Sequence, residues 1–174
     1  MSSPDPETKS MLAVSWLIRT ETPADLPTVE HLQEEAFGPG RFARTAFRVR
    51  EGIAPDPELC FVGMSGEEIA GSVWLTPITI GGAPAQLLGP LTVAPAFKNR
   101  GLGRLLVKHA LEAAAARGET HVLLVGDGPY YGPLGFAPVP FGTVIFPGPV
   151  DPGRVLVACL GGAAMPSGMV RGGR

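Results

Sequence analysis

The spacing of apolar residues along the chain divides it into strand-like and helix-like segments. Short runs rich in valine, isoleucine and leucine, or runs that alternate with period two, are typical of strands. Such runs occupy Trp16–Arg19, Leu59–Ser65, Ile69–Ile80, Ala85–Val93, His121–Gly126, Thr143–Phe146 and Val155–Leu160. We therefore expect a sheet of six to seven strands.

Three segments instead repeat apolar residues every three or four positions, which predicts one buried helix face. These segments are Leu26–Phe37, Phe42–Arg50 and Gly101–Arg117. Asp25 is the expected N-terminal cap of the first helix, because Pro27 then falls in the first turn, where its missing N–H costs little. Gly118 is the expected C-terminal cap of the third helix.

Glycine and proline predict the turns and irregularities of the sheet. Gly81-Gly82 favours a tight hairpin turn between two long strands, which would then run antiparallel. Pro77 has no N–H for a strand ladder, so its strand is expected to lie at an edge or to break there. Gly89-Pro90 predicts a bulge or a splay in the following strand.

Length and composition indicate one folded domain. The chain has 174 residues, of which 45% are hydrophobic, and this is enough for a sizeable core. We expect the domain at residues 16–160, a mobile arm at 1–15 and a loose, slightly basic tail at 161–174. The apolar stretch 11–17 is short and has no A-x-A cleavage site, and no apolar run is long enough to span a membrane.

Charge and cysteine content narrow the classes of partner. The net charge is −2, whereas binding to a nucleic-acid backbone depends on clustered lysine and arginine, so no nucleic-acid partner is expected. Cys60 and Cys159 are far apart and have no metal-ligand spacing, so neither a zinc site nor a disulfide framework is predicted. A reducing, cytoplasmic environment fits this pattern.

A glycine-bearing basic turn lies between the strand that ends at Val93 and the third helix. Backbone N–H groups at a helix start are unpaired and carry the positive end of the helix dipole. Gly101 and Gly103 would let a ligand approach these groups closely, and Lys98, Arg100 and Arg104 add positive charge. The sequence therefore predicts a seat for a phosphate or pyrophosphate.

Two common phosphate motifs do not fit this turn. A P-loop needs Gly-Lys followed by Ser or Thr, but Gly103 is followed by Arg104. A dinucleotide fingerprint needs a third glycine at the position of Leu106. Taken alone, the two glycines are equally compatible with an ordinary strand-to-helix loop.

A second motif follows the strand His121–Gly126, where Tyr131 stands four residues before Gly135-Phe136. Together with residues 98–103, this pattern resembles the GNAT superfamily of N-acetyltransferases, whose pyrophosphate motif is [QR]-x-x-G-x-[GA]. Lys98 stands where the family usually has glutamine or arginine, which keeps the charge but loses the planar fork. The resemblance covers roughly Trp16 to Leu160 and is strongest to the branch of predicted acetyltransferases described as YhbS-like.

The resemblance implies an α/β (α+β) fold with a mixed, mostly antiparallel sheet and helices on both faces. The strands that end at Val93 and Gly126 would be parallel neighbours that part to admit the pantetheine arm of acetyl-CoA. The implied reaction moves an acetyl group from acetyl-CoA to a primary amine by direct transfer, with acetyl-CoA as cosubstrate and no metal. The acceptor would be a small molecule or a peptide, and many relatives are homodimers.

The same resemblance assigns roles to individual residues. Tyr131 is the candidate general acid for the leaving thiolate, and the alternative is a packing aromatic; Tyr130 is expected to pack. The expected cofactor-binding residues are Leu91, Val93, Lys98, Asn99, Arg100, Gly101, Leu102, Gly103, Arg104 and Asp127. Of these, Leu91 and Val93 would offer backbone groups to the pantetheine and thioester, and Lys98–Arg104 would hold the pyrophosphate. Asp127 is either a contact to pantetheine or a turn residue.

Acidic residues near the start of the chain supply candidates for the general base and for acceptor recognition. Glu34 and Glu35 lie near the end of the first predicted helix, where each is either a base or a surface carboxylate. Together with Glu21, Asp25 and Glu30 they favour a cationic acceptor or a solvated helix surface. Two other functions fit the same residues: a non-catalytic acyl-CoA-binding regulatory domain, and a nucleotide-binding domain that prefers ATP or NAD.

Overall fold

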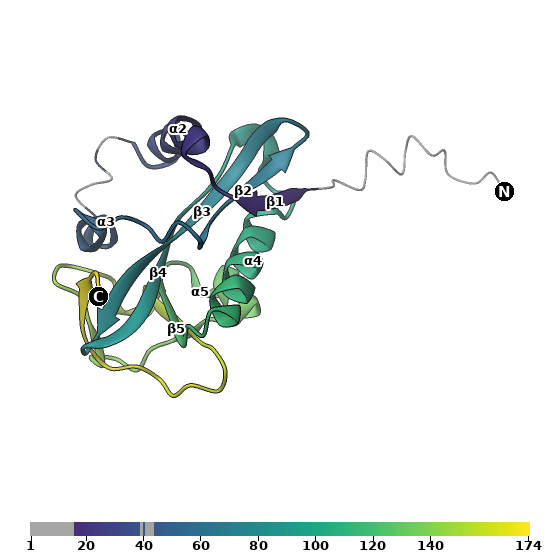
Figure 1. Cartoon of the computed structure of the whole chain (residues 1–174). Helices are drawn as coiled ribbons and strands as arrows, with labels where there is room; N and C mark the ends of the chain where they lie inside the picture. Colours follow the sequence, from purple (N-terminus) through teal and green to yellow (C-terminus); the bar gives the residue numbers. More distant parts are fainter. Residues whose placement is uncertain (1–15, 39, 41–43) are drawn as a thin grey trace.

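The computed structural model describes residues 16–38, 40 and 44–174, and a mixed sheet forms its centre (Figure 1). Its strands are β1 (Leu17–Thr20), β2 (Cys60–Ser65), β3 (Glu68–Ile80), β4 (Ala83–Val93), β5 (His121–Val125), β6 (Ala137–Pro138), β7 (Val144–Ile145), β8 (Val155–Cys159) and β9 (Gly168–Gly172). The order is β1-β2-β3-β4-β5-β8-β6, and β9 pairs with β3 and β7. Only β4–β5 and β7–β9 are parallel, so the predicted mixed, mostly antiparallel sheet is confirmed. The predicted arm at 1–15 lies outside the described residues.

Helices cover both faces of the sheet (Figure 1). They are α2 (Leu26–Phe37), α3 (Thr45–Arg50), α4 (Leu102–Ala116) and α5 (Gly128–Tyr131). The second predicted helix, Phe42–Arg50, begins at Thr45, and residues 42–43 of that prediction fall outside the described part. Gly118 follows the end of α4 with a φ of 82°, as predicted for a C-terminal glycine. No helix in the described ranges has the length and apolar character needed to cross a bilayer.

Neighbouring residues of β5 pack on opposite faces of the sheet, which explains why the sequence of this strand is a continuous apolar run. Val122 and Leu124 pack in the cluster that contains α4, whereas Leu123 packs with Val49 of α3 on the opposite face. All three β5 residues are buried, because both faces of the sheet are covered. The two faces therefore hold separate hydrophobic cores.

The irregularity predicted at Gly89-Pro90 is present and opens the sheet. Pairing between β3 and β4 passes from Leu75↔Leu88 to Val73↔Leu91, so two residues of β4 face one residue of β3. On the other side, β4 pairs with β5 only at Gln86↔Val122 and Leu87↔Leu123. The two parallel strands therefore part at the bulge, which confirms the expected splay.

Pro77 does not lie in an edge strand, so that prediction is wrong. β3 continues through Pro77 to Ile80, and the Pro77 carbonyl accepts a hydrogen bond from the Gly173 amide at 2.9 Å. The side of β3 that Pro77 faces is divided between β2, whose pairing ends at Trp74, and β9, whose pairing begins at Ile78. Pro77, which has no N–H to donate, lies where the pairing with β2 has ended and the pairing with β9 has not yet begun. The break is therefore between the two partner strands, and β3 itself is continuous.

The C-terminal segment differs from the expected loose tail. β9 pairs with the end of β3, and the side chain of Val170 is fully buried. Arg174 donates to Glu119 at 2.6 Å and to the Ala85 carbonyl at 3.1 Å. The strand escaped prediction because it is short and begins and ends with glycine, which weakens the strand pattern.

Asp25 begins α2 as predicted, but its carboxylate does not cap the helix. It accepts hydrogen bonds from both terminal nitrogens of Arg19, at 2.7 and 2.9 Å, and from the Thr22 amide at 2.7 Å. This bidentate pair connects β1 to the start of α2, and it thereby fixes where α2 lies against the sheet.

The buried position of Val170 gives a direct test of β9. We expect Val170→Ala to lower the free energy of unfolding by about 1–3 kcal/mol, because it leaves a cavity against β3. Arg171→Ala is the matched control on the exposed side of the same strand and should change it by less than about 0.5 kcal/mol. Urea unfolding curves measure both, and equally small effects would contradict a packed β9.

The Asp25–Arg19 pair gives a pH-dependent test. Hydrogen bonds from Arg19 lower the pKa of the Asp25 carboxyl, and burial opposes them only in part. Because the pKa is lower in the folded state, the pair stabilises the fold at neutral pH, and this contribution is lost as the pH falls below about 4. Asp25→Asn should therefore lower the free energy of unfolding by about 1–2 kcal/mol at pH 7 and by less at pH 3. The same loss at both pH values in urea unfolding would contradict this origin.

Candidate active site

Two adjoining cavities lie where β4 and β5 part. The first, which we call the strand cavity, has a volume of about 660 Å³ and is lined by the β4 bulge, the end of β5, α3 and residues 149–151. The second, the loop cavity, has a volume of about 480 Å³ and is lined by Val93, Phe97 and the turn that leads into α4. Tyr130 lines both cavities, so they meet at its ring.

The loop cavity collects most of the predicted cofactor-binding residues. They are Val93, Lys98, Asn99, Gly101, Leu102, Gly103 and Arg104. Leu91, Asp127 and Tyr131 line the strand cavity instead, and Arg100 lines neither of the two. The predicted set is thus divided between two neighbouring spaces that share one side chain.

The backbone of this turn leaves the start of α4 open. Asn99 and Gly101 have positive φ values of 63° and 86°, and Gly101 precedes the helix without any side chain capping it. The first backbone hydrogen bond that closes onto this end runs from the Leu105 amide to the Gly101 carbonyl. The amides of residues 102–104 therefore have no partner within the helix and are directed at the loop cavity.

The backbone of β4 beyond the bulge faces the gap between the strands. The Ala94 amide donates to the carbonyl of Ala70 in β3, at 2.8 Å. Because successive residues of a strand point their backbone groups to opposite sides, Thr92 also faces β3, whereas Leu91 and Val93 face away from it. Their N–H and C=O groups thus point toward the gap between β4 and β5, where the resemblance predicts the pantetheine arm.

Tyr130 does more than the packing expected from the sequence. A Cβ on Gly103 would lie 2.5 Å from the Tyr130 hydroxyl oxygen, so only glycine fits where this hydroxyl meets the start of α4. The guanidinium carbon of Arg104 lies 5.5 Å from the centre of the Tyr130 ring, within the range of a cation–π contact. Tyr130 therefore forms part of the wall between the two cavities.

Tyr131 is a packed aromatic residue that lines the strand cavity. Its ring packs edge-on against Tyr130 and Phe136, and a Cβ on Gly126 would lie 2.6 Å from one of its ring carbons. Burial raises the pKa of Tyr131 to about 12, with smaller contributions from Tyr130 and Asp127. The phenol is therefore protonated at neutral pH, so a ring that packs tightly also retains a proton to donate.

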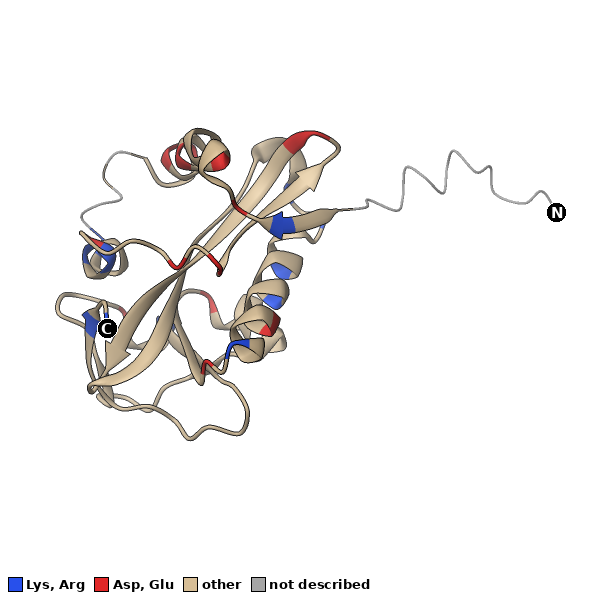
Figure 2. Cartoon of the chain, viewed as in Figure 1, with Lys and Arg blue, Asp and Glu red and all other residues tan. Residues whose placement is uncertain are grey.

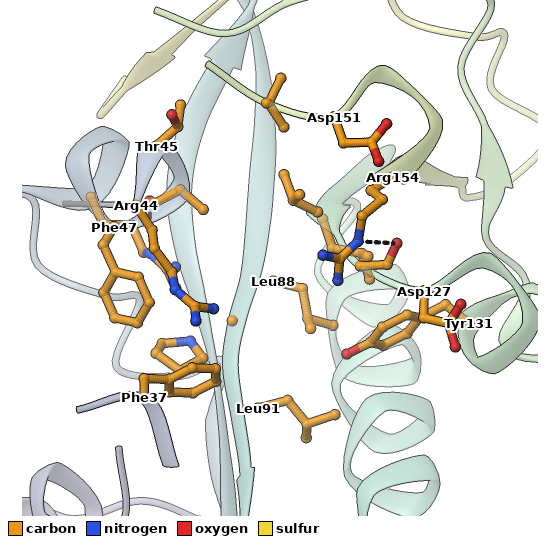
Figure 3. A pocket seen from close by; sticks show the side chains of 18 of the residues that line it. Phe37, Arg44, Thr45, Phe47, Leu88, Leu91, Asp127, Tyr131, Asp151 and Arg154 are labelled. Atoms are coloured by element: carbon orange, nitrogen blue, oxygen red, sulfur yellow. Dashed lines mark hydrogen bonds between the residues drawn. The ribbon is translucent and has the colours of Figure 1, made fainter. Parts of the chain in front are cut away.

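Arginines supply most of the charge in the strand cavity. Figure 3 shows Arg44 and Phe47 on one side and Asp127, Tyr131 and Arg154 on the other. Arg154 donates to the Gly126 carbonyl at 3.4 Å. These arginines were not predicted as site residues, because they belong to no sequence motif.

A third cavity, the α2–α3 cavity, opens beside the bulge. It has a volume of about 490 Å³ and shares Phe47, Arg50 and Pro90 with the strand cavity. Gln33 of α2, and Trp74 and Thr76 of β3, complete much of its lining. The shared residues make it a side chamber of the strand cavity, on the face of the sheet opposite α4.

The acidic residues proposed as a base or as an acceptor site lie mostly elsewhere. Figure 2 shows acidic residues in red on α2. Glu34 and Glu35 of this helix are exposed and line none of the three cavities. Asp25 is held by Arg19, and Glu21 accepts a hydrogen bond from the Trp74 indole at 3.0 Å. Of the five acidic residues, only Glu30 lines one of these cavities. The acidic stretch therefore gives little support to a cationic acceptor.

The sequence of this chain is similar to those of known proteins. The family model for the acetyltransferase (GNAT) family matches residues 26–130. A protein of Escherichia coli (strain K12) described as an uncharacterized N-acetyltransferase, YhbS, is 29% identical over 129 residues, which cover 69% of this chain and 72% of YhbS.

Solved structures show the same fold. The structure of YhbS from Escherichia coli in complex with CoA aligns with a TM-score of 0.75 at 24% identity and covers 99% of this chain and 94% of YhbS. A GNAT family acetyltransferase from Brucella melitensis in complex with acetyl-CoA gives a TM-score of 0.70 at 24% identity, over 91% of this chain and 96% of that one. Because the family model spans more than half of the sequence, including β4, the glycine turn and α4, the chain belongs to the GNAT family of acetyltransferases.

Proposed function

We propose that the protein moves an acetyl group from acetyl-CoA to a primary amine by direct transfer, with Tyr131 as general acid. One observation carries this proposal: an open, basic helix start adjoins a cavity that is lined by a partly buried, protonated tyrosine. The open helix start can bind the diphosphate of CoA, and the tyrosine can give a proton to the leaving thiolate. YhbS and the Brucella melitensis relative were crystallised with CoA and acetyl-CoA, which supports the same cosubstrate here.

In the proposed complex, the pyrophosphate sits in the loop cavity on the amides of residues 102–104, with Lys98 and Arg104 supplying charge. The pantetheine arm follows β4 and pairs with the backbone groups of Leu91 and Val93. The thioester then arrives in the strand cavity, next to Tyr131. This path uses the gap between the parted strands as the channel for the cosubstrate.

The reaction needs three contributions from the site. The amine must be neutral before its nitrogen attacks the carbonyl carbon. The carbonyl oxygen becomes negative in the tetrahedral intermediate, and a β4 backbone N–H near Val93 stabilises it. As the carbon–sulfur bond breaks, the sulfur takes the Tyr131 proton. The nitrogen then loses its extra proton to water, and the Tyr131 phenolate takes a proton from water, which restores the phenol.

Tyr131→Phe tests the catalytic role with the aromatic ring retained. Loss of the general acid should lower kcat about 100-fold or more, with little change in the affinity for acetyl-CoA. Release of CoA, followed with a thiol reagent across a panel of amines, measures the rate, and calorimetry with acetyl-CoA measures the affinity. An unchanged kcat would exclude Tyr131 as the acid. Tight binding of acetyl-CoA without turnover of any amine would instead favour a non-catalytic acyl-CoA-binding domain.

Arg104→Ala tests the pyrophosphate seat. Removing one charged donor should weaken CoA binding about 10- to 100-fold, because hydrogen bonds to charged groups contribute roughly 1.5–3 kcal/mol. Lys108→Ala, exposed one turn further along α4, is the control and should leave the dissociation constant unchanged. Titration calorimetry with CoA and with pantetheine, which has no phosphate, separates the contributions. Equal weakening for both ligands would contradict a role in phosphate binding.

A further inference from the structure

Buried hydrogen-bond donors without partners gather at one place in the molecule. Four buried side-chain nitrogen or oxygen atoms in the described residues form no hydrogen bond, and three of them belong to Arg50, Gln33 and Thr76. All three residues line the α2–α3 cavity, and the fourth, Gln86, does not. Because buried polar groups are nearly always satisfied, such a concentration points to an absent ligand.

Of the three residues, Arg50 has the greatest need of a binding partner, because it is charged. Its Nε donates to the Ala46 carbonyl at 3.1 Å and its guanidinium carbon lies 4.6 Å from the Phe47 ring centre, but Nη1 has no partner among the described residues. No ion pair with a carboxylate is found there either, and burial lowers the pKa of Arg50 to about 10. The group is still cationic at neutral pH, and an unpaired buried cation is unfavourable unless an anion joins it.

The position of Arg50 relates this anion site to the reacting centre. A Cβ on Gly89 would lie 3.3 Å from a terminal nitrogen of Arg50, so the guanidinium reaches the β4 bulge. Arg50 lines both the α2–α3 cavity and the strand cavity, together with Phe47 and Pro90. An anion held here is thus adjacent to the space where the thioester is proposed to arrive.

We propose that the α2–α3 cavity binds a carboxylate of the acceptor through Arg50, Gln33 and Thr76, so that the acceptor is an amino acid or a similar amine that carries a carboxylate. This inference rests on the proposed acetyl transfer. The planar guanidinium matches a carboxylate in a two-point contact, and the Gln33 amide and the Thr76 hydroxyl supply further donors. The amine of such an acceptor lies close to its carboxylate and therefore enters the strand cavity beside the bulge.

The rest of the lining favours a zwitterion over a phosphate dianion. Glu30 and Glu51 also line the α2–α3 cavity, and both side chains are exposed at its outer part. Two carboxylates near a bound phosphate dianion would repel it more strongly than they repel the single negative charge of a zwitterion's carboxylate. Trp74, Ile53 and Pro55 supply apolar surface for a side chain.

Arg50→Met tests this assignment, because methionine is similar in length and uncharged. Each amino acid is assayed beside its decarboxylated amine with acetyl-CoA. The wild-type enzyme should prefer the amino acid in kcat/KM, and Arg50→Met should reduce this preference about 10- to 100-fold, the value of a lost charged hydrogen bond. The change should appear mainly in KM. Arg48→Met, exposed on the same helix, is the control and should keep the preference.

Three further readouts separate the alternatives. An equal or higher melting temperature for Arg50→Met supports the proposal, because a buried unpaired charge is removed, whereas a clear loss of stability would assign Arg50 a structural role. An effect confined to succinyl-CoA as donor would place the carboxylate on the acyl group and overturn the acceptor assignment. If no amine is turned over while CoA still binds, the proposed acetyl transfer is wrong. Calorimetry then tests the carboxylate site by itself. Binding of amino acids to the wild type but not to Arg50→Met would still support the site, and equal or absent binding would overturn it.

Discussion

The parting of β4 and β5 is the feature on which the rest of the site depends. These parallel strands pair at only two positions before the bulge at Gly89 and Pro90 turns β4 toward β3. Backbone groups that a continuous sheet would use for pairing remain unpaired at Leu91 and Val93. The strand cavity and the proposed route of the cosubstrate both depend on this interruption of one hydrogen-bonded ladder.

The two proposed substrates meet positive charge from opposite faces of the sheet. On one face, the start of α4 offers uncapped amides together with Lys98 and Arg104. On the other face, α3 offers Arg50, whose charge no carboxylate in the described chain neutralises. The gap between the strands connects these two positive regions, so each substrate is anchored by its anionic part while its reactive group extends into the shared space.

The sequence predicted the parts of the fold that depend on local chemistry. The glycine turn before α4, the hairpin at Gly81-Gly82 and the bulge at Gly89-Pro90 are each set by residues next to one another. Pro77 and β9 were misread because their structure depends on which distant strand lies beside them. Arg50 and Tyr130 were missed as site residues for a similar reason: their roles arise from contacts with Gly89 and Gly103, which no spacing in the sequence indicates.

The path of β9 has a practical consequence for handling the protein. Arg174 is bonded to Glu119, whose side chain is only 7% exposed, and β9 supplies Val170 to the core. A segment fused directly after Arg174 would therefore begin beside an ion pair in which the Glu119 side chain is nearly buried. A flexible spacer is advisable for any C-terminal fusion, so that the last strand keeps its place in the sheet.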